Sequence, residues 1–169
     1  MSNIPVLWVE EFEELRKDES SFFGSHFRRG IDWSMDSLKL IDSYLEELHN
    51  GFARSGGIFG RLFRKPPLNG PQVEMVVHLT GAYVGEVIRK HCMAGYNWYP
   101  FEDWISKNPS HVEYLGTTAE LGTVFVLGNA DGDMCLPFAK VVKFLHNGRE
   151  DSVYFFAQAM AADNQKIKQ

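Results

Sequence analysis

The chain of 169 residues has the length of one domain, and its 44% hydrophobic and 23% charged residues are typical of a globular protein. Its net charge of −5 excludes an overall field that would draw it to nucleic acid or anionic lipid. Cys92 and Cys135 are too few for a disulfide framework, and we expect two reduced thiols rather than a single bridge. The N-terminus lacks a secretory pattern and no apolar run is long enough to cross a membrane, so we expect a cytoplasmic protein.

Two segments in the first half of the chain show helical periodicity. Residues 8–18 combine four glutamates with apolar residues on one side, which predicts a short acidic helix. A longer helix is expected to run to His49, with Asp32 or Ser34 capping its first turn. The Asn-Gly pair at 50–51 tolerates the left-handed backbone of a helix end, so we expect the helix to stop there.

Glycines and prolines are concentrated at residues 51–71, which predicts a mobile loop. Arg61, Arg64 and Lys65 lie among phenylalanines in this loop and form a candidate anion-binding site. The glycines are not a phosphate-binding motif, because no Gly-Lys-Ser/Thr follows them and no strand precedes them. A solvated basic loop without a ligand is the alternative.

The strongest helical period covers residues 72–93. Gly81 and Gly85 lie one turn apart in this segment, and glycine inside a helix costs about 1 kcal/mol relative to alanine. We therefore expect a strand or a neighbouring helix to pack closely against these two positions.

The second half predicts a small antiparallel sheet. Residues 96–104 are aromatic and strand-like, and Pro100 suits an edge strand or a bulge. Residues 121–127 read as a central strand, and the turn at 129–132 returns the chain to residues 134–136. Two helices follow, the first beginning at Pro137 and ending near His146, and the second capped by Ser152. The whole chain, residues 1–169, is thus predicted to be a helix-rich α+β domain whose sheet packs against the long helix.

The aromatic and acidic segment 96–104 is the main candidate for a partner surface. Large aromatic side chains beside charges are the chemistry that anchors protein interfaces. The residues concerned are Trp98, Tyr99, Glu102, Asp103 and Trp104. Alternation along a strand also accounts for the pattern, and on that interpretation most of these side chains belong to the core.

The pattern of titratable residues predicts no metal, cofactor or catalytic centre. Glu74 and His78 have the spacing of helical metal ligands, but no His-Glu-x-x-His signature is present, and a surface pair is the simpler interpretation. The acids around Gly132 form a hairpin turn rather than a calcium loop, because no closing Glu follows. Glu86 is expected to pair with Lys90 on the surface, with a buried general base as the alternative.

The order of motifs in residues 72–156 resembles a pattern found in small bacterial proteins of unknown function. The pattern consists of a helix with Gly-x-x-x-Gly and an acid, a Trp-bearing strand, a hairpin, and a Pro-Phe-x-Lys-Val-x-Lys helix ending at Asn-Gly. Its residues here are Gly81, Gly85, Glu86, Trp98, Pro137, Phe138, Lys140, Val141, Lys143, Asn147 and Gly148. The resemblance carries no active site, and proteins of this acidic, motif-poor sort include toxin-immunity proteins.

We therefore expect a bacterial partner-binding protein, of which an immunity-type inhibitor is the specific form, with a protein as its partner. The alternative is a small hydrolase or transferase that acts on an anionic substrate in a cleft near Glu86 and His78. A flat apolar patch with an acidic rim favours the first function, whereas convergent titratable groups favour the second.

Overall fold

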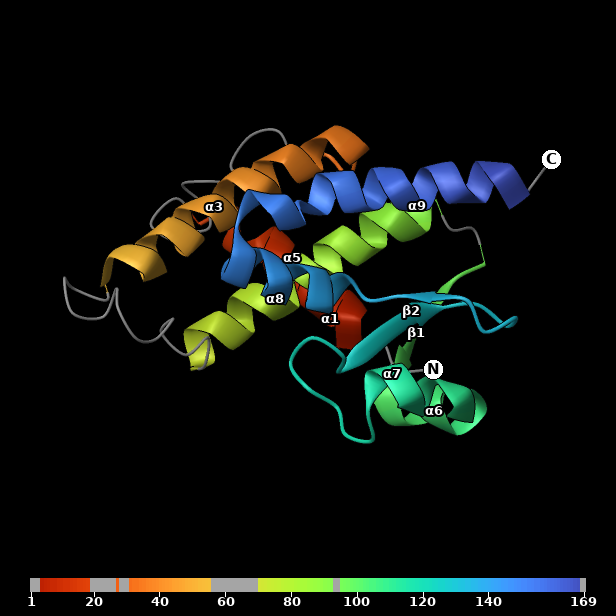
Figure 1. Cartoon of the computed structure of the whole chain (residues 1–169). Coiled ribbons are helices and arrows are strands. Elements are labelled where there is room, and N and C mark those ends of the chain that lie inside the picture. The colour runs from red at the N-terminus through yellow and green to blue at the C-terminus, as the bar shows by residue number, and fades with distance from the viewer. Residues whose placement is uncertain (1–3, 19–26, 28–30, 56–69, 93–94, 168–169) are drawn as a thin grey trace.

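The computed structural model describes residues 4–18, 27, 31–55, 70–92 and 95–167 and has a helix-rich α+β fold (Figure 1). The longer helices lie side by side above a small sheet, and two short helices cover the opposite end of that sheet. The longer helices are α1 (Ile4–Leu15), α3 (Leu38–Ser55), α5 (Pro71–His91), α8 (Pro137–Asn147) and α9 (Val153–Ile167). The short ones are α6 (Phe101–Lys107) and α7 (Val112–Leu115), with 3-10 turns η1 (Met35–Ser37), η2 (Pro109–His111) and η3 (Arg149–Asp151).

The helix α5 is the central packing element, as predicted, and it contacts α1, α8 and α9. Its two glycines are the points of closest approach. A Cβ atom on Gly81 would lie 2.6 Å from the ring of Phe138 in α8, and one on Gly85 would overlap the ring of Trp98. Both a helix and a strand therefore press on α5, and larger side chains at these two positions would separate them.

The sheet is antiparallel, with the order β1-β2-β3. Its strands are β1 (Asn97–Pro100), β2 (Phe125–Gly128) and β3 (Met134–Cys135). The side-chain oxygen of Asn129 accepts hydrogen bonds from the backbone N–H groups of Asp131 and Asp133, at 3.0 and 2.9 Å. Gly132 adopts a φ of 92° in the same loop. The predicted turn is confirmed, since Asn129 uses its oxygen to hold the backbone.

Several element boundaries differ from the prediction, beginning with the first helix, which spans Ile4–Leu15 rather than residues 8–18. The helix α3 continues through Asn50 and Gly51 to Ser55, because an Asn-Gly pair permits a helix end without requiring one. The first strand ends at Pro100, which cannot donate to a ladder, and α6 begins next with Glu102 and Asp103 in its first turn. The central strand begins only at Phe125, since the chain turns just before it.

The predicted loop at 51–71 is only partly described. Residues 51–55 belong to α3, and Gly70 precedes Pro71 at the start of α5. Residues 56–69, with Arg61, Arg64 and Lys65, lie outside the described part of the chain, so the anion-binding loop stays a prediction.

Both cysteines are buried and reduced, as predicted. Among the described helices, none is long and apolar enough to cross a membrane.

Candidate functional site

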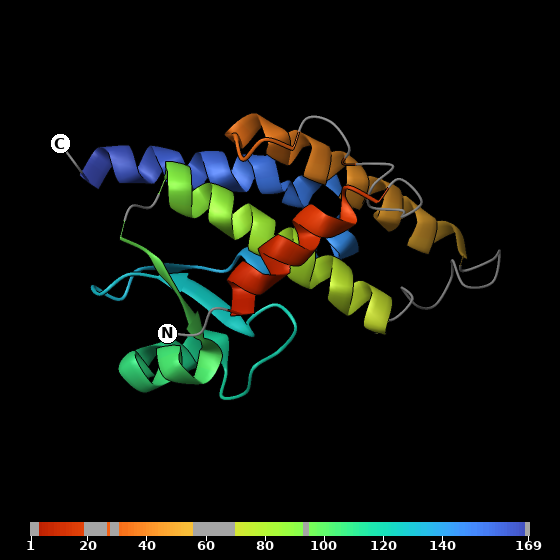
Figure 2. The same ribbon diagram turned by 180° about the vertical axis from the view of Figure 1, so that it is seen from behind.

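A groove of about 260 Å³ lies between α1 and the N-terminal half of α5. Figure 2 shows α1 crossing over α5 on this side of the molecule. Seven residues line the groove: Trp8, Glu11, Pro71, Glu74, Met75, His78 and Leu79. We call this set the Trp8 groove.

The floor of the Trp8 groove is an uncharged aromatic stack. The rings of Trp8 and His78 lie parallel, with centroids 4.1 Å apart and planes 4° from each other. Phe125 and Phe138 meet Trp8 edge to face at 5.5 and 5.6 Å, which holds the indole in place. Burial lowers the pKa of His78 against the opposing effect of Glu74, so its imidazole is neutral at pH 7.

The rim of the Trp8 groove is acidic. Glu11 and Glu74 are exposed, and neither forms an ion pair with another described residue. Two neighbouring glutamates of α1 are neutralised instead, since Glu13 pairs with Arg16 and Glu14 pairs with Lys17. The groove therefore presents two negative charges without compensation from the described chain.

Exposed apolar side chains adjoin this acidic rim. Leu7 is 56% exposed and lies one turn before Glu11 on α1, while Met75 is 40% exposed beside Glu74 on α5. Large apolar side chains in solvent next to a hollow mark an interaction surface. The groove thus combines an apolar contact area with a negative rim.

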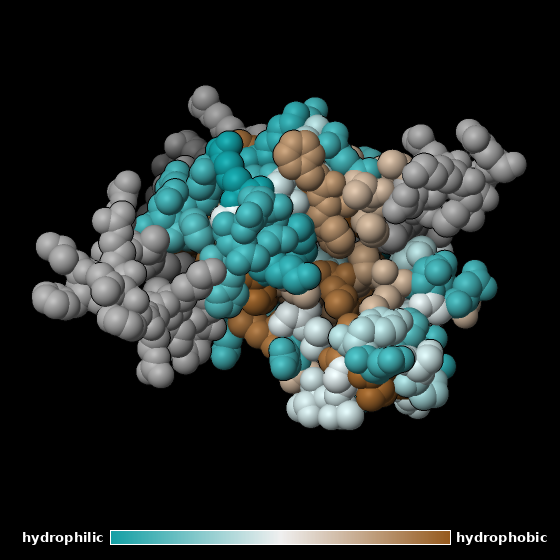
Figure 3. Space-filling model, viewed as in Figure 1, coloured by the Kyte–Doolittle hydropathy of each residue, from teal (hydrophilic) through white to brown (hydrophobic). Residues whose placement is uncertain are grey.

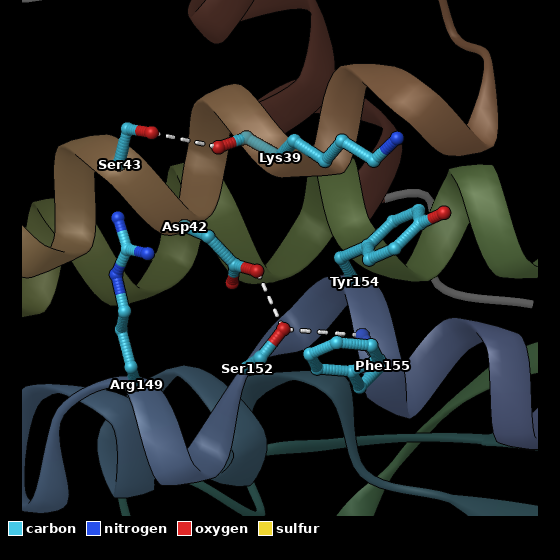
Figure 4. Close-up of a pocket in the computed structure, with 7 residues that line it drawn as sticks. All are labelled: Lys39, Asp42, Ser43, Arg149, Ser152, Tyr154 and Phe155. Carbon is cyan, nitrogen blue, oxygen red and sulfur yellow. Dashed lines mark hydrogen bonds between the residues drawn. The ribbon is translucent and has the colours of Figure 1, made fainter.

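A second pocket, of about 380 Å³, lies between α3 and the start of α9 (Figure 4). The carboxylate of Asp42 accepts a hydrogen bond from the hydroxyl of Ser152 at 2.5 Å and one from the backbone N–H of Val153 at 2.8 Å. The hydroxyl of Ser152 in turn accepts from the backbone N–H of Phe155 at 3.1 Å. These bonds satisfy free N–H groups at the N-terminus of α9, which confirms the predicted cap.

The charged groups of this second pocket are occupied within the fold. Lys39 pairs with Asp36, and Arg149 pairs with Glu46 at 2.6 Å. Burial raises the pKa of Asp42 because it disfavours the charged carboxylate, and the hydrogen bonds from Ser152 and Val153 do not offset this effect. The pocket is therefore a joint between two helices, in which Asp42 and Ser152 cap α9.

The surface beside this joint is apolar. Figure 3 shows an apolar band over the first half of α9, next to a hydrophilic region. Phe155, which lines the joint, is 68% exposed, and Ala159 and Ala162 follow it along the exposed side of α9.

The predicted aromatic partner surface requires a correction at two of its residues. Trp98 and Trp104 are buried, with 7% and 1% of their surfaces exposed, so neither is available as a surface anchor. The indole N–H of Trp98 donates to Glu86 at 2.8 Å, and that of Trp104 donates to His111 at 2.9 Å. Both rings fill the core instead, because their N–H groups find acceptors inside the protein.

The other residues of that segment remain at the surface. Tyr99 is half-buried, and the amine of Lys107 lies 4.7 Å from the centre of its ring. Glu102 and Asp103 are exposed on α6. A partner role for these three residues stays a prediction, without the two tryptophans that were expected to supply its contact area.

The predicted surface pair between Glu86 and Lys90 is wrong. Glu86 is buried, and both of its carboxylate oxygens accept hydrogen bonds from Arg89, at 2.9 and 2.8 Å. Lys90 instead lies 4.0 Å from the centre of the Trp33 ring. Burial alone would raise the pKa of Glu86, but Arg89 and Trp98 hold it below its ordinary value. A carboxylate that is held ionised in this way is a poor general base.

Glu86 and His78, the two residues expected to share the alternative catalytic cleft, do not line the Trp8 groove together. Glu86 is absent from the lining of the groove that contains His78. Among the described residues, no group of three His, Cys, Asp or Glu side chains is arranged to hold a metal ion.

The Trp8 groove itself is absent from the sequence prediction. The helical spacings of Leu7 with Glu11 and of Glu74 with His78 were available as signals. What the sequence lacks is any sign that α1 crosses α5 at Trp8. No family model, curated protein or solved structure matches the chain, so its own geometry is the basis for the function.

Proposed function

We propose that this chain is a partner-binding protein that recognises another protein through the Trp8 groove. The observation that carries the proposal is the neutral stack of Trp8 and His78, bordered by two uncompensated carboxylates and by the exposed side chains of Leu7 and Met75. An aromatic and methionine-containing hollow with a polar rim has the composition of an interface centre.

An immunity-type inhibitor of a toxin or effector is the specific form of this proposal. Two features support it: the order of motifs in residues 72–156, and an acidic groove suited to a basic target surface. A catalytic function has less support, because Glu86 is engaged by Arg89 and lies outside the groove.

A pair of charge insertions tests the proposal. Met75→Glu places one negative charge in the lining of the groove, and the position is exposed, so the fold is retained. Phe155→Glu is the matched control, since it inserts the same charge at an exposed apolar position outside the groove lining. The thermal transition of each variant is recorded first.

Cross-linking in the source cells, followed by quantitative mass spectrometry, then compares the three proteins. We expect at least one cross-linked protein to be lost from the groove variant and kept by the control. Co-expression with the product of the neighbouring gene tests the immunity form, because protection of growth should follow the same pattern. Identical cross-linking by all three proteins would contradict a role for the groove.

A further inference from the structure

We propose that the Trp8 groove takes an arginine side chain of the partner, presented between apolar residues. This inference rests on the proposed function and names the chemical group that the groove recognises. The argument combines the charge, the ring stack and the flanking side chains of the groove.

The two carboxylates of the groove favour a cationic ligand. Glu11 belongs to α1 and Glu74 to α5, and both residues line the same hollow. The other titratable side chain that lines it, His78, is neutral at pH 7 because burial lowers its pKa. A cation placed between the two carboxylates removes a like-charge repulsion that the free protein retains.

The aromatic floor favours arginine over lysine. The planar guanidinium group stacks flat on aromatic faces and donates several hydrogen bonds in its own plane, whereas an ammonium group meets a ring only as a compact charge and its donors lie in no common plane. Trp8 and His78 line the groove together with the two acids. One guanidinium can therefore lie against the aromatic floor while its N–H groups reach Glu11 and Glu74.

The flanking side chains define the neighbours of that arginine. Leu7 and Met75 are exposed next to the two acids, so apolar residues on either side of the arginine would cover them. Met75 has a flexible side chain that adapts to partners of different shape. The preferred motif is an arginine with an apolar residue before and after it.

A titration with short peptides tests this inference on the full chain. The probe is acetyl-Leu-Arg-Leu-amide. Two peptides carry citrulline or lysine in place of arginine, and citrulline keeps the shape of arginine without its charge. Binding is followed by NMR from the Trp8 indole signal and the backbone amides of Glu74 and Met75. We expect saturable shifts with the arginine peptide and at least about tenfold weaker binding of the citrulline peptide, a difference of about 1.4 kcal/mol. The lysine peptide should fall between the two.

Three variants test the roles of the carboxylates. Glu11→Gln and Glu74→Gln should each weaken the arginine peptide about tenfold, as expected for the loss of a charge-assisted hydrogen bond. Glu14→Gln is the control, because Glu14 already pairs with Lys17 and does not line the groove. Its affinity should equal that of the unchanged protein.

The possible outcomes separate the two proposals. Equal binding of the citrulline and arginine peptides, unchanged affinity in both groove variants, or no saturable shift with any peptide would overturn the arginine inference. None of these results bears on the cross-linking comparison. The groove would then remain a proposed partner surface, but one that does not bind a cation. Identical cross-linking by the groove variant and its control would instead contradict the proposed partner-binding function.

Discussion

The carboxylates of Asp42 and Glu86 each connect two elements of the fold by hydrogen bonds, but their electrostatic environments differ. Each carboxylate projects from a long helix and accepts a hydrogen bond from a different element of the fold. Asp42 on α3 holds the first turn of α9, through Ser152 and Val153. Glu86 on α5 holds the indole of Trp98 in β1. The two joints attach the last helix and the sheet to the rest of the protein.

The pKa values of the two carboxyls move in opposite directions, although burial acts on both. Burial raises the pKa of Asp42, and the bonds from Ser152 and Val153 do not reverse this effect. At Glu86 the two bonds from the Arg89 guanidinium, with that from Trp98, outweigh burial and lower the pKa. The comparison shows that the neutral donors at Asp42 do not offset burial, whereas the guanidinium that bonds to Glu86 in two places, together with the Trp98 indole, does.

The largest expected effect comes from disturbing the Glu86 joint through its packing. In Gly85→Ala the new methyl group would overlap the ring of Trp98 and displace its N–H from Glu86. We expect the free energy of unfolding to fall by about 2–3 kcal/mol. Urea denaturation followed by circular dichroism measures this change. Gly51→Ala is the control, because nothing lies within 4 Å of a Cβ at that exposed helical position. Equal midpoints for the two variants would show that Trp98 does not press on α5.

Removal of the charge at Glu86 should have the next largest effect. Glu86→Gln keeps the shape of the side chain but loses the ion pair with Arg89, which should cost about 2 kcal/mol at pH 7. Because the folded pKa lies below the ordinary 4.5, the stabilisation is present above that pH and is lost as the pH falls through the folded value. When the pH is lowered, the urea midpoint of the variant should therefore fall less than that of the unchanged protein. The same fall in both proteins would contradict the conclusion that the charge of Glu86 stabilises the fold.

A smaller effect is expected at the cap of α9. Ser152→Ala removes the hydroxyl that bonds to Asp42 and to the N–H of Phe155, and it should cost about 1 kcal/mol. Ser43 is the matched control in the same pocket, because its hydroxyl bonds only to the carbonyl of Lys39 within α3. Thermal unfolding of both alanine variants measures the difference. A similar loss in Ser43→Ala would mean that the cap does not carry the stabilisation.

The smallest effect is expected from removal of the charge at Asp42. Asp42→Asn resembles the protonated acid, which the fold prefers, so stability at pH 7 should change by about 0.5 kcal/mol or less. The raised pKa means that the contribution of Asp42 is fully present below the ordinary 3.8 and is lost as the pH rises through the folded value. This direction is opposite to that of Glu86. If Asp42→Asn lowered the free energy of unfolding at pH 7 as much as Glu86→Gln, the proposed difference between the two carboxyls would be contradicted.

Features within one or two turns of the chain were determined by the sequence. The cap by Ser152 and the turn at Asn129 follow from local rules, and so does the spacing that places Gly81 and Gly85 one turn apart on a helix. Backbone hydrogen bonds and helical spacing act over a few residues, so the residue types at those positions are sufficient to specify them. The helix-rich α+β class follows from the same local periodicities.

Contacts between distant elements were decided only by the tertiary structure. Composition could not show that Trp98 and Trp104 are buried while Phe155 is exposed, since all three are large aromatic residues in amphipathic segments. The stack of Trp8 on His78 depends on where α1 crosses α5, and the hydrogen bond from Trp98 to Glu86 depends on which face of α5 the sheet covers. Helix crossing and sheet docking are set by the packing of the whole core, because each buried side chain must find space and polar partners among elements far apart in the sequence.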